Sequence, residues 1–387
     1  MPVRATKRGA QRTPLDGRRD VLICGASFAG LAIARELAGS GADVLMIDRY
    51  EIGERQTSAC GIPTEWLRRL GLMNSECQRF DTLVMHTPHG TSRYKLPWTF
   101  STFDYKRLCQ LLWEDCDAQF ETAKVNGRAD FPSPQDGNST HEIAVDTDRG
   151  VIAAPLVVDA LGWRRMLATG DGYQPPDAPL SRGLEVHPGG KNDDLEIWID
   201  RKYVPAGYGW SFPAADELRI GVGSFDPRFH VKDTTVLLTE DLGKRPNEYQ
   251  GNWIPHKLRK ATEGGVFFAG DSAGHCLPLS AEGIRTALYF GVALGRELRA
   301  VVEGKQSREQ AAATYAAFND SHEWKFKWML RVQKLVPRVP PPLLAPLIRL
   351  MGNKRFVDWS FGHYLNIAPP EFVQEPDSAR KPTPVPA

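Results

Sequence analysis

VLICGASFAG, at residues 21–30, is the segment of this 387-residue chain that is most informative about its architecture. Its apolar run is typical of a buried β-strand, and the strand leads into a turn of small residues: Gly25, Ala26, Ser27, Ala29 and Gly30. A helical run, LAIARELAGSG, follows at residues 31–41. A second apolar strand, VLMID at residues 44–48, ends in Asp48, and Arg49 comes next. The order of strand, glycine turn, helix, strand and acid predicts a dinucleotide-binding unit.

The parts of such a unit have separate tasks. Gly25 permits the tight turn, and Gly30 lets the helix pack closely against the strand. Free backbone N–H groups at the helix N-terminus face a pyrophosphate, while Asp48 accepts hydrogen bonds from a ribose. Ser27 stands where the usual G-x-G-x-x-G has its middle glycine, and its side chain is small enough for that position.

A second stretch, FFAGDSAGHCLPLSAEGIRTALYFG at residues 267–291, indicates which dinucleotide binds. A strand end leads through small residues and a proline to a helix start, and the candidate contacts are Gly270, Asp271, Pro278, Gly283 and Ile284. The stretch resembles flavoproteins of the glutathione-reductase type, in which the matching Asp bonds the ribityl chain and the helix N-terminus stabilises an anionic reduced flavin. The resemblance implies FAD, and an ordinary helix cap is the alternative for Asp271.

A third stretch, APLVVDALGWRR at residues 154–165, resembles the D-x-x-G segment of flavin hydroxylases and their reductase relatives. It contributes Asp159 and Gly162 as FAD contacts, and Val125 completes the predicted set. The arginine that these proteins carry ahead of the next helix is replaced by Tyr105, so Arg107 is left without a role.

These stretches predict an α/β protein with a glutathione-reductase-type, FAD-binding Rossmann-like domain, an inserted antiparallel β substrate domain and C-terminal helices. The FAD-binding domain is expected to combine residues 20–80, 104–170 and 260–303. The substrate domain is expected at residues 81–103 and 171–259, where residues 195–199 and 217–223 have the composition of strands. A helical cap is expected at residues 304–368, and disordered ends at residues 1–19 and 369–387.

Composition limits the classes of function. The formal net charge is +1 and no nucleic-acid module is recognisable, so a nucleic-acid partner is not expected. The basic leader has no apolar core of a signal peptide, no apolar run is long enough to span a bilayer, and the six cysteines have no disulfide or metal-site spacing. We expect a cytoplasmic protein without a metal site, and contact with a membrane surface is left open for the leader and the cap.

The segment VPAGYGWSFP at residues 204–213 is the candidate substrate wall. Tyr208, Trp210 and Phe212 alternate along a strand that Pro213 is expected to end, and therefore share one face. Such a face suits the wall of a large apolar pocket, but periodicity alone favours a place in the core between sheet and helix.

The same segment, P-x-x-Y-x-W-x-F-P followed by a glycine-rich strand, resembles the substrate-domain signature of the geranylgeranyl reductase family of flavoproteins. GASFAG, ACG at residues 59–61, DALG and GDSAGHCLPLSAEGI stand in the order of that family, so the resemblance covers most of the chain. It implies FAD-dependent reduction of carbon–carbon double bonds in a long isoprenoid chain of a lipid or quinone, with NAD(P)H or a redox protein as electron donor.

The resemblance also implies a catalytic role for Cys60, because the family places a Cys-Gly pair on a loop near the flavin. A thiol there could donate or position the proton that accompanies hydride transfer, and a buried, merely hydrophobic cysteine is the alternative. Ala281 departs from the family, which has glycine there, and the family lysine ahead of the cysteine is missing from ERQTSAC.

Two other functions stay open. The Y-x-W-x-F-P run is close to the W-x-W-x-I-P of flavin halogenases, so a flavin-dependent monooxygenase or halogenase acting on an aromatic natural product is one alternative. The other is a non-catalytic flavin- or lipid-binding protein, which the departures at Tyr105 and Ala281 would suit.

Overall fold

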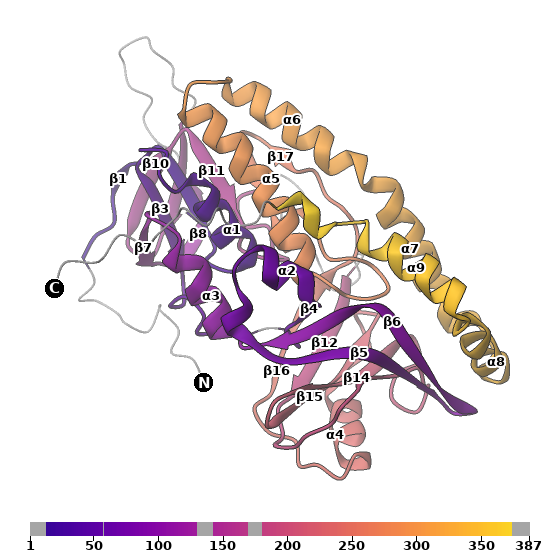
Figure 1. Ribbon diagram of the computed structural model, residues 1–387. Coiled ribbons are helices and arrows are strands. Elements are labelled where there is room, and N and C mark those ends of the chain that lie inside the picture. Colours follow the sequence, from indigo (N-terminus) through magenta and orange to yellow (C-terminus); the bar gives the residue numbers. More distant parts are fainter. Residues whose placement is uncertain (1–12, 57, 130–141, 169–179, 374–387) are drawn as a thin grey trace.

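The computed structural model describes residues 13–56, 58–129, 142–168 and 180–373. Within these ranges the chain forms a six-stranded, a four-stranded and an eight-stranded sheet, and the helices of the C-terminal third run along one side of the molecule (Figure 1). The predicted fold class is confirmed, since the Rossmann-like domain, a second and mainly antiparallel sheet and the C-terminal helices are all present.

The six-stranded sheet brings the three diagnostic stretches together. Its central strands are parallel and buried: β18 (Val266–Phe268), β11 (Leu156–Asp159), β2 (Val21–Cys24) and β3 (Val44–Asp48). The outer strands are β7 (Gln119–Thr122), which is parallel to β3, and β17 (Thr262–Glu263), which is antiparallel to β18. Because the carboxyl ends of parallel strands meet at one edge, the turns after β2, β11 and β18 lie side by side.

One helix lies against this sheet, and two more pack on that helix. Helix α1 (Phe28–Leu37) packs against α5 (Ile284–Val302) through small residues. A Cβ added at Gly291 of α5 would lie 2.8 Å from the carbonyl oxygen of Ala29, so the two backbones nearly touch. Helix α3 (Tyr105–Glu114) lies beside α1 and begins at Tyr105, with Asp104 as its N-cap.

The four-stranded sheet corrects the prediction for the N-terminal arm. Its strands are β1 (Gly17–Arg18), β10 (Gly150–Ala154), β9 (Ile143–Thr147) and β8 (Val125–Ala129). Residues 1–19 were expected to be disordered, but Leu15 is buried and its N–H donates to the carbonyl of Arg149 at 2.7 Å. The prediction considered only the basic composition and missed that an open edge of β10 can pair with a short strand; residues 1–12 lie outside the described residues.

The eight-stranded sheet forms the second layer. Its order is β16 (Gln250–Pro255), β12 (Leu180–Val186), β15 (Glu217–Ser224), β14 (Gly207–Ala214), β13 (Leu195–Trp198), β5 (Glu76–Thr87), β6 (Gly90–Phe103) and β4 (Gly61–Pro63). The strands expected at residues 195–199 and 217–223 are confirmed as β13 and β15. Helix α4 (Lys232–Asp241) packs against β15 and β12.

Local boundaries differ from the predictions in this sheet. Strand β4 and the start of β5 at Glu76 belong to it, although residues 20–80 were assigned to the other domain. Pro213 was expected to end its strand but lies within β14, next to the hairpin, where its carbonyl accepts a hydrogen bond from Thr102 Oγ1 at 2.7 Å. The division into domains as a whole stays a prediction.

The C-terminal helices run along one side of both layers (Figure 1). They are α6 (Arg308–Ser321), α7 (Glu323–Leu335), α8 (Pro341–Met351) and α9 (Lys354–Leu365), and α8 and α9 contact the long β5–β6 hairpin. The tail expected to be disordered from residue 369 continues as a short 3-10 turn, Pro370–Phe372, and Val373 is buried. It packs because its apolar residues meet α2 (Thr64–Arg69) and α5; residues 374–387 lie outside the described part.

Candidate active site

A cavity of about 1140 Å³ extends from the edge of the six-stranded sheet to the helices α8 and α9. This volume exceeds the usual upper range of about 1,000 Å³ for a single small-molecule site. Most predicted site residues line it: Ala26, Ser27, Ala29, Asp48, Arg49, Val125, Gly162, Gly270, Asp271, Gly283, Ile284, Tyr208, Trp210 and Phe212. The others lie behind the wall: Gly25, Gly30, Cys60, Asp159, Pro278 and Pro213.

The glycine turn after β2 is shaped by close backbone contacts. Gly25 has a φ of +115°, and a Cβ there would lie 2.3 Å from the carbonyl oxygen of Ala160. A Cβ at Gly30 would lie 1.9 Å from the carbonyl oxygen of Gly25, so neither position accepts a side chain. Ser27 makes no capping hydrogen bond to α1, and the first turn of α1 holds no acid. The first N–H groups of α1 are thus suited to an anion at the cavity wall.

The carboxylate of Asp48, at the end of β3, binds the backbone of this glycine turn. Its Oδ2 accepts a hydrogen bond from Ala26 N at 2.9 Å, and its Oδ1 accepts one from Tyr50 N at 3.0 Å. Burial raises the pKa of Asp48, and the two backbone donors oppose that rise. Both oxygens keep acceptor capacity toward the cavity, as contact with a ribose requires.

Asp159 organises two loops from behind the wall. It is fully buried, and its oxygens accept hydrogen bonds from Leu161 N at 3.0 Å, Leu167 N at 2.8 Å and Ser272 Oγ at 2.7 Å. The D-x-x-G segment therefore reaches the cavity through Gly162, while its aspartate ties the loop after β11 to the loop after β18.

Asp271 and the start of α5 form another part of the wall. Burial raises the pKa of Asp271 to about 6, and Arg259 opposes the rise. Gly283 is the N-cap of α5, as expected, and the first turn of the helix holds no acid. Ala281 has a φ of +53°, a backbone conformation that favours glycine, which gives a physical reason for the glycine that the family has there.

The aromatic segment of β14 is wall rather than core. Tyr208, Trp210 and Phe212 are half-buried and line the cavity, so the core placement that periodicity favoured is wrong. Tyr208 donates to the carbonyl of Ser280 at 2.6 Å, on the loop before α5. A Cβ at Gly221 would lie 2.2 Å from the ring of Trp210, so the glycine-rich return strand leaves room for the indole.

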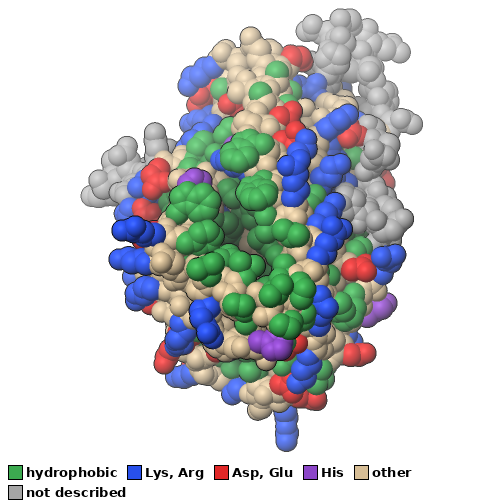
Figure 2. All heavy atoms as spheres, turned by 90° about the vertical axis from the view of Figure 1, so that its right-hand side faces the viewer, with side chains coloured by type: hydrophobic (Ala, Val, Ile, Leu, Met, Phe, Trp, Pro, Cys, Tyr) green, Lys and Arg blue, Asp and Glu red, His purple; other side chains and the backbone are tan. Residues whose placement is uncertain are grey.

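The far end of the cavity is apolar. The eight-stranded sheet contributes Leu83, Met85, Leu96 and Ile197, and the helices contribute Leu344, Ile348 and Phe361. On the side of the molecule where α8 and α9 lie, hydrophobic side chains ring a hollow in the surface (Figure 2). This end has the lining and the reach to hold a long hydrocarbon chain.

Cys60 lies next to the cavity, but it is not one of the residues that line it. The residue is fully buried with a φ of +54°, and its Sγ donates to the carbonyl of Ser58 at 3.1 Å. Burial raises the pKa of the Cys60 thiol, while Arg219 opposes the rise. Ala59 and Gly61 line the wall instead. The strained backbone at Cys60 is the kind of feature that gathers at functional sites.

The sequence interpretation missed several residues of the wall. Tyr105 lines the cavity with its hydroxyl 3.4 Å from Ser27 Oγ, whereas Arg107 is directed to Glu114 at 2.7 Å on the surface. Glu185 and Gln250 also line the cavity. The signal for Glu185 was its position two residues from His187 in LEVHP, which puts a carboxylate and an imidazole at neighbouring places of one strand face.

No protein-family model matches the chain. Among curated proteins it is similar to digeranylgeranylglycerophospholipid reductase 3 of Methanosphaera stadtmanae, with 25% identity over 371 residues, 86% of this chain and 91% of the relative. It is also similar to the digeranylgeranylglycerophospholipid reductase of Methanosarcina acetivorans, with 23% identity over 76% of this chain and 79% of the relative.

Solved structures share the fold. A geranylgeranyl bacteriochlorophyll reductase-like protein from Thermoplasma acidophilum superposes with a TM-score of 0.76 at 16% identity, covering 93% of this chain and 98% of that one. The p-nitrophenol 4-monooxygenase of Pseudomonas putida has a TM-score of 0.71 at 13% identity, covering 92% and 99%. The resemblance that the motifs predicted is confirmed by the names of the sequence relatives.

Proposed function

Because this chain is a homologue of the geranylgeranyl reductases, we propose that it is an FAD-dependent oxidoreductase that reduces carbon–carbon double bonds in a long isoprenoid chain of a lipid or quinone. The observation that carries the proposal is one continuous cavity with dinucleotide-binding elements at one end and an apolar channel at the other. A monooxygenase or halogenase acting on an aromatic compound is less well supported, because its support is a likeness of fold at low identity.

The residues present fit an FAD molecule. The closely packed Gly25 and Gly30, the uncapped start of α1 and the free acceptor capacity of Asp48 suit a pyrophosphate and a ribose. Asp271 would hold the ribityl chain, and the N-terminus of α5 would face the pyrimidine end of the ring. When bound and reduced, the flavin supplies the hydride. NAD(P)H or a redox protein is the proposed source of its electrons.

The protein's part in substrate binding is to exclude water and to hold the chain in line. Tyr208 is tied to the loop before α5, and so joins the aromatic wall of β14 to the proposed flavin site. Each methylene that leaves water for such a channel contributes about 0.8 kcal/mol. Affinity is therefore expected to rise with the length of the isoprenoid chain until the channel is filled.

We propose that α7 to α9 rest on an anionic membrane surface, from which a lipid substrate enters. Large apolar side chains are exposed on these helices, among them Trp324, Trp328, Leu343, Leu350 and Trp359. Residues 323–365 contain eight lysines and arginines against two acids, and blue side chains flank the green ring around the hollow (Figure 2). This composition suits helices that lie in a lipid interface. Among the described residues, no helix is long and apolar enough to cross a bilayer.

The test is an anaerobic single-turnover reaction. Protein loaded with FAD and reduced by dithionite is mixed with prenyl diphosphates, prenylated glycerolipids and menaquinones, and the products are weighed by mass spectrometry. A gain of two hydrogens per double bond is the expected result. Insertion of oxygen or halogen in air without any hydrogenation would overturn the proposal in favour of a monooxygenase or halogenase, and no uptake of FAD would exclude both.

A further inference from the structure

A line of buried polar side chains connects solvent with the cavity wall, apart from the proposed flavin contacts. It begins at Glu185 of β12, which is 3% exposed and lines the cavity. It continues through His187, which is 9% exposed and lies behind the wall, to Glu217 at the start of β15. The side chain of Glu217 is 35% exposed, so the line reaches the surface there.

At the cavity end, three groups hold Glu185 in one orientation. Its Oε1 lies 3.0 Å from His187 Nε2 and also accepts from the amide of Gln250, while its Oε2 accepts from Trp210 Nε1 at 3.2 Å. The carboxyl group is thereby fixed beside the tryptophan of the aromatic wall. Truncation of such a buried, hydrogen-bonded group would leave its partners without hydrogen bonds and would destabilise the protein. A loss of stability therefore does not by itself demonstrate a catalytic role for Glu185.

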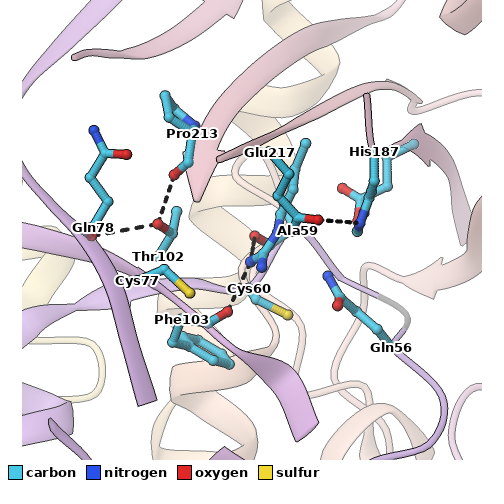
Figure 3. Close-up of polar contacts among 12 residues, drawn as sticks. Gln56, Ala59, Cys60, Cys77, Gln78, Thr102, Phe103, His187, Pro213 and Glu217 are labelled. Atoms are coloured by element: carbon cyan, nitrogen blue, oxygen red, sulfur yellow. Dashed lines mark hydrogen bonds and ion pairs between the residues drawn. The ribbon is translucent and has the colours of Figure 1, made fainter. Parts of the chain in front are cut away.

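At the solvent end, the line meets the loop that carries Cys60. Glu217 Oε2 lies 3.7 Å from His187 Nδ1, and Glu217 Oε1 accepts from Arg219 Nε at 2.8 Å (Figure 3). Arg219 in turn donates to the carbonyls of Ala59 and Phe103, both at 2.9 Å. The line and the wall loop at Ala59 therefore form one hydrogen-bonded unit.

His187 carries a proton at neutral pH. Burial disfavours the imidazolium, but its hydrogen bonds to Glu185 and Glu217 outweigh burial and raise the pKa of His187 to about 9. The bond to His187, helped by Arg219 against the effect of burial, holds the pKa of Glu217 at about 2. The charged groups facing His187 are Glu185 from its own segment and Glu217 from β15, with Arg219 behind Glu217, and Gln250 of β16 is its neutral neighbour.

We propose that Glu185 delivers the proton of alkene reduction, and that this proton reaches Glu185 from solvent through Glu217 and His187. This inference rests on the proposed function. Saturation of a double bond adds a hydride, with two electrons, to one carbon and a proton to the other, while the reduced flavin is oxidised by two electrons. In the resting state the proton lies on His187, and the Glu185 carboxylate accepts a hydrogen bond from it. As the second C–H bond forms, this proton passes from the His187 imidazolium through Glu185 to the alkene carbon, which leaves Glu185 a carboxylate and His187 neutral. A proton from water then passes along the Glu217 carboxylate to His187.

The geometry favours Glu185 over Cys60 for this task. Cys60 does not line the cavity, and its thiol donates to the carbonyl of Ser58, whereas Glu185 lines the cavity and has a titratable neighbour that leads outward. A donor without such a connection would have to wait for water to enter an apolar channel after every turnover. Glu185 is thus the proposed catalytic residue, and His187 and Glu217 act through it.

The test compares Glu185→Gln with Glu196→Gln. Glu196 also pairs with a histidine on the eight-stranded sheet, His86 at 3.3 Å, but it does not line the cavity. In anaerobic single-turnover reactions of the FAD-loaded, reduced protein, Glu185→Gln is expected to lower the rate about 100-fold, the usual contribution of a general acid. Glu185→Asp should recover part of the rate, and Glu196→Gln should leave it unchanged. FAD uptake and the unfolding midpoint serve as checks that Glu185→Gln is folded.

A second readout does not depend on turnover. In protein labelled with ¹³C at histidine Cε1, the His187 resonance, assigned with His187→Asn, should titrate near pH 9 in the wild type and at lower pH in Glu185→Gln. Reduction at an undiminished rate and with an unchanged pH profile by Glu185→Gln would overturn the inference. So would a His187 resonance that does not respond to that substitution. A wild-type protein that reduces no isoprenoid would instead overturn the proposed function. The titration of His187 would then still show whether it is coupled to Glu185.

Discussion

At the residue scale, Gly25 belongs to the glycine motif of the sequence and also allows the close backbone contact beside the cavity. Its φ of +115° is unfavourable for any residue with a side chain, and an added Cβ would press against Ala160 O at 2.3 Å. We expect Gly25→Ala to lower the free energy of unfolding by about 3 kcal/mol, as strain and overlap act together. The change also displaces the loop after β11, so FAD binding should be lost. Urea denaturation and FAD titration measure the two effects.

Gly39 provides the matched control for this substitution. It also has a positive φ, +74°, but an added Cβ would meet nothing within 4 Å. Gly39→Ala should therefore cost about 1 kcal/mol from backbone strain and leave FAD binding intact. Equal losses in both variants would contradict the claim that close approach to Ala160 fixes the glycine at residue 25.

The family resemblance implies that Cys60 donates a proton, whereas its surroundings in the structure suggest that it does not. Its thiol is fully buried and bonded to Ser58 O, and burial raises its pKa, so the thiol stays protonated and shielded. Cys60→Ala is expected to lower the single-turnover rate by less than about tenfold, since a proton donor is worth about 10²-fold or more. A loss of 100-fold, with FAD binding retained, would restore Cys60 as the donor and argue against Glu185.

At the element scale, the exposed face of α7 to α9 is the part of the molecule most open to a membrane. Trp328 and Trp359 are 58% and 60% exposed there. We expect Trp328→Ser with Trp359→Ser to weaken binding to vesicles of anionic phospholipid about tenfold, or about 1.4 kcal/mol, because partial burial of two indoles is lost. Vesicle sedimentation measures the change, and added salt should weaken wild-type binding by screening the basic side chains.

Tyr249 is the control for this surface. It is 47% exposed but lies just before β16, where its ring contacts Lys232 of α4. Tyr249→Ser should leave sedimentation with vesicles unchanged. Wild-type protein that stays in the supernatant with anionic vesicles at low salt would rule out the membrane contact and leave the helices as a cap over the cavity.

Elements formed from local apolar runs could be predicted from the sequence, whereas contacts between distant elements could not. Strands β2 and β11 are local apolar runs that lead into turns with glycine, so their fold and their place at the cavity were accessible from residues 21–30 and 154–165. The wall residue Glu185 was only partly accessible: His187 follows it two residues later in LEVHP, but its partners Trp210 and Gln250 lie on strands that are 25 and 65 residues away in the sequence. Tertiary pairing of that kind leaves no local pattern.

Dependence on tertiary contacts also explains why sequence periodicity favoured a core position for Tyr208, Trp210 and Phe212 of β14. Alternation gives one shared face, but the choice between core and cavity depends on what covers that face. Here Gly183, Gly221 and Gly223 on neighbouring strands leave space around Trp210, and the loop before α5 stands opposite. A face covered by glycines and loops stays open to a ligand, whereas one covered by a helix becomes core.

At the scale of the whole molecule, two buried histidines join the C-terminal helices to the sheets. His275 Nδ1 accepts from Gly270 N at 3.1 Å, and its Nε2 lies 3.0 Å from Asn319 Oδ1 of α6. His256 Nδ1, on the strand side, contacts Gln333 of α7 at 2.9 Å. Burial lowers the pKa of His275 to about 3 and, with a smaller effect of Lys334, that of His256 to about 4.

These shifts predict loss of stability in acid. Both histidines are neutral in the folded state down to low pH, whereas their unfolded pKa is near 6.5, so between pH 6.5 and about 3 the unfolded chain binds more protons. Their contribution is complete above pH 6.5 and falls with decreasing pH by up to about 1.4 kcal/mol per pH unit for each histidine. Asp271, with its raised pKa of about 6, acts in the opposite sense. His256→Gln with His275→Gln should therefore flatten the acid limb of a plot of unfolding free energy against pH, while the exposed His89→Gln should not. An acid limb of equal slope in all three proteins would show that carboxylates, and not these two histidines, govern the attachment of the helices at low pH.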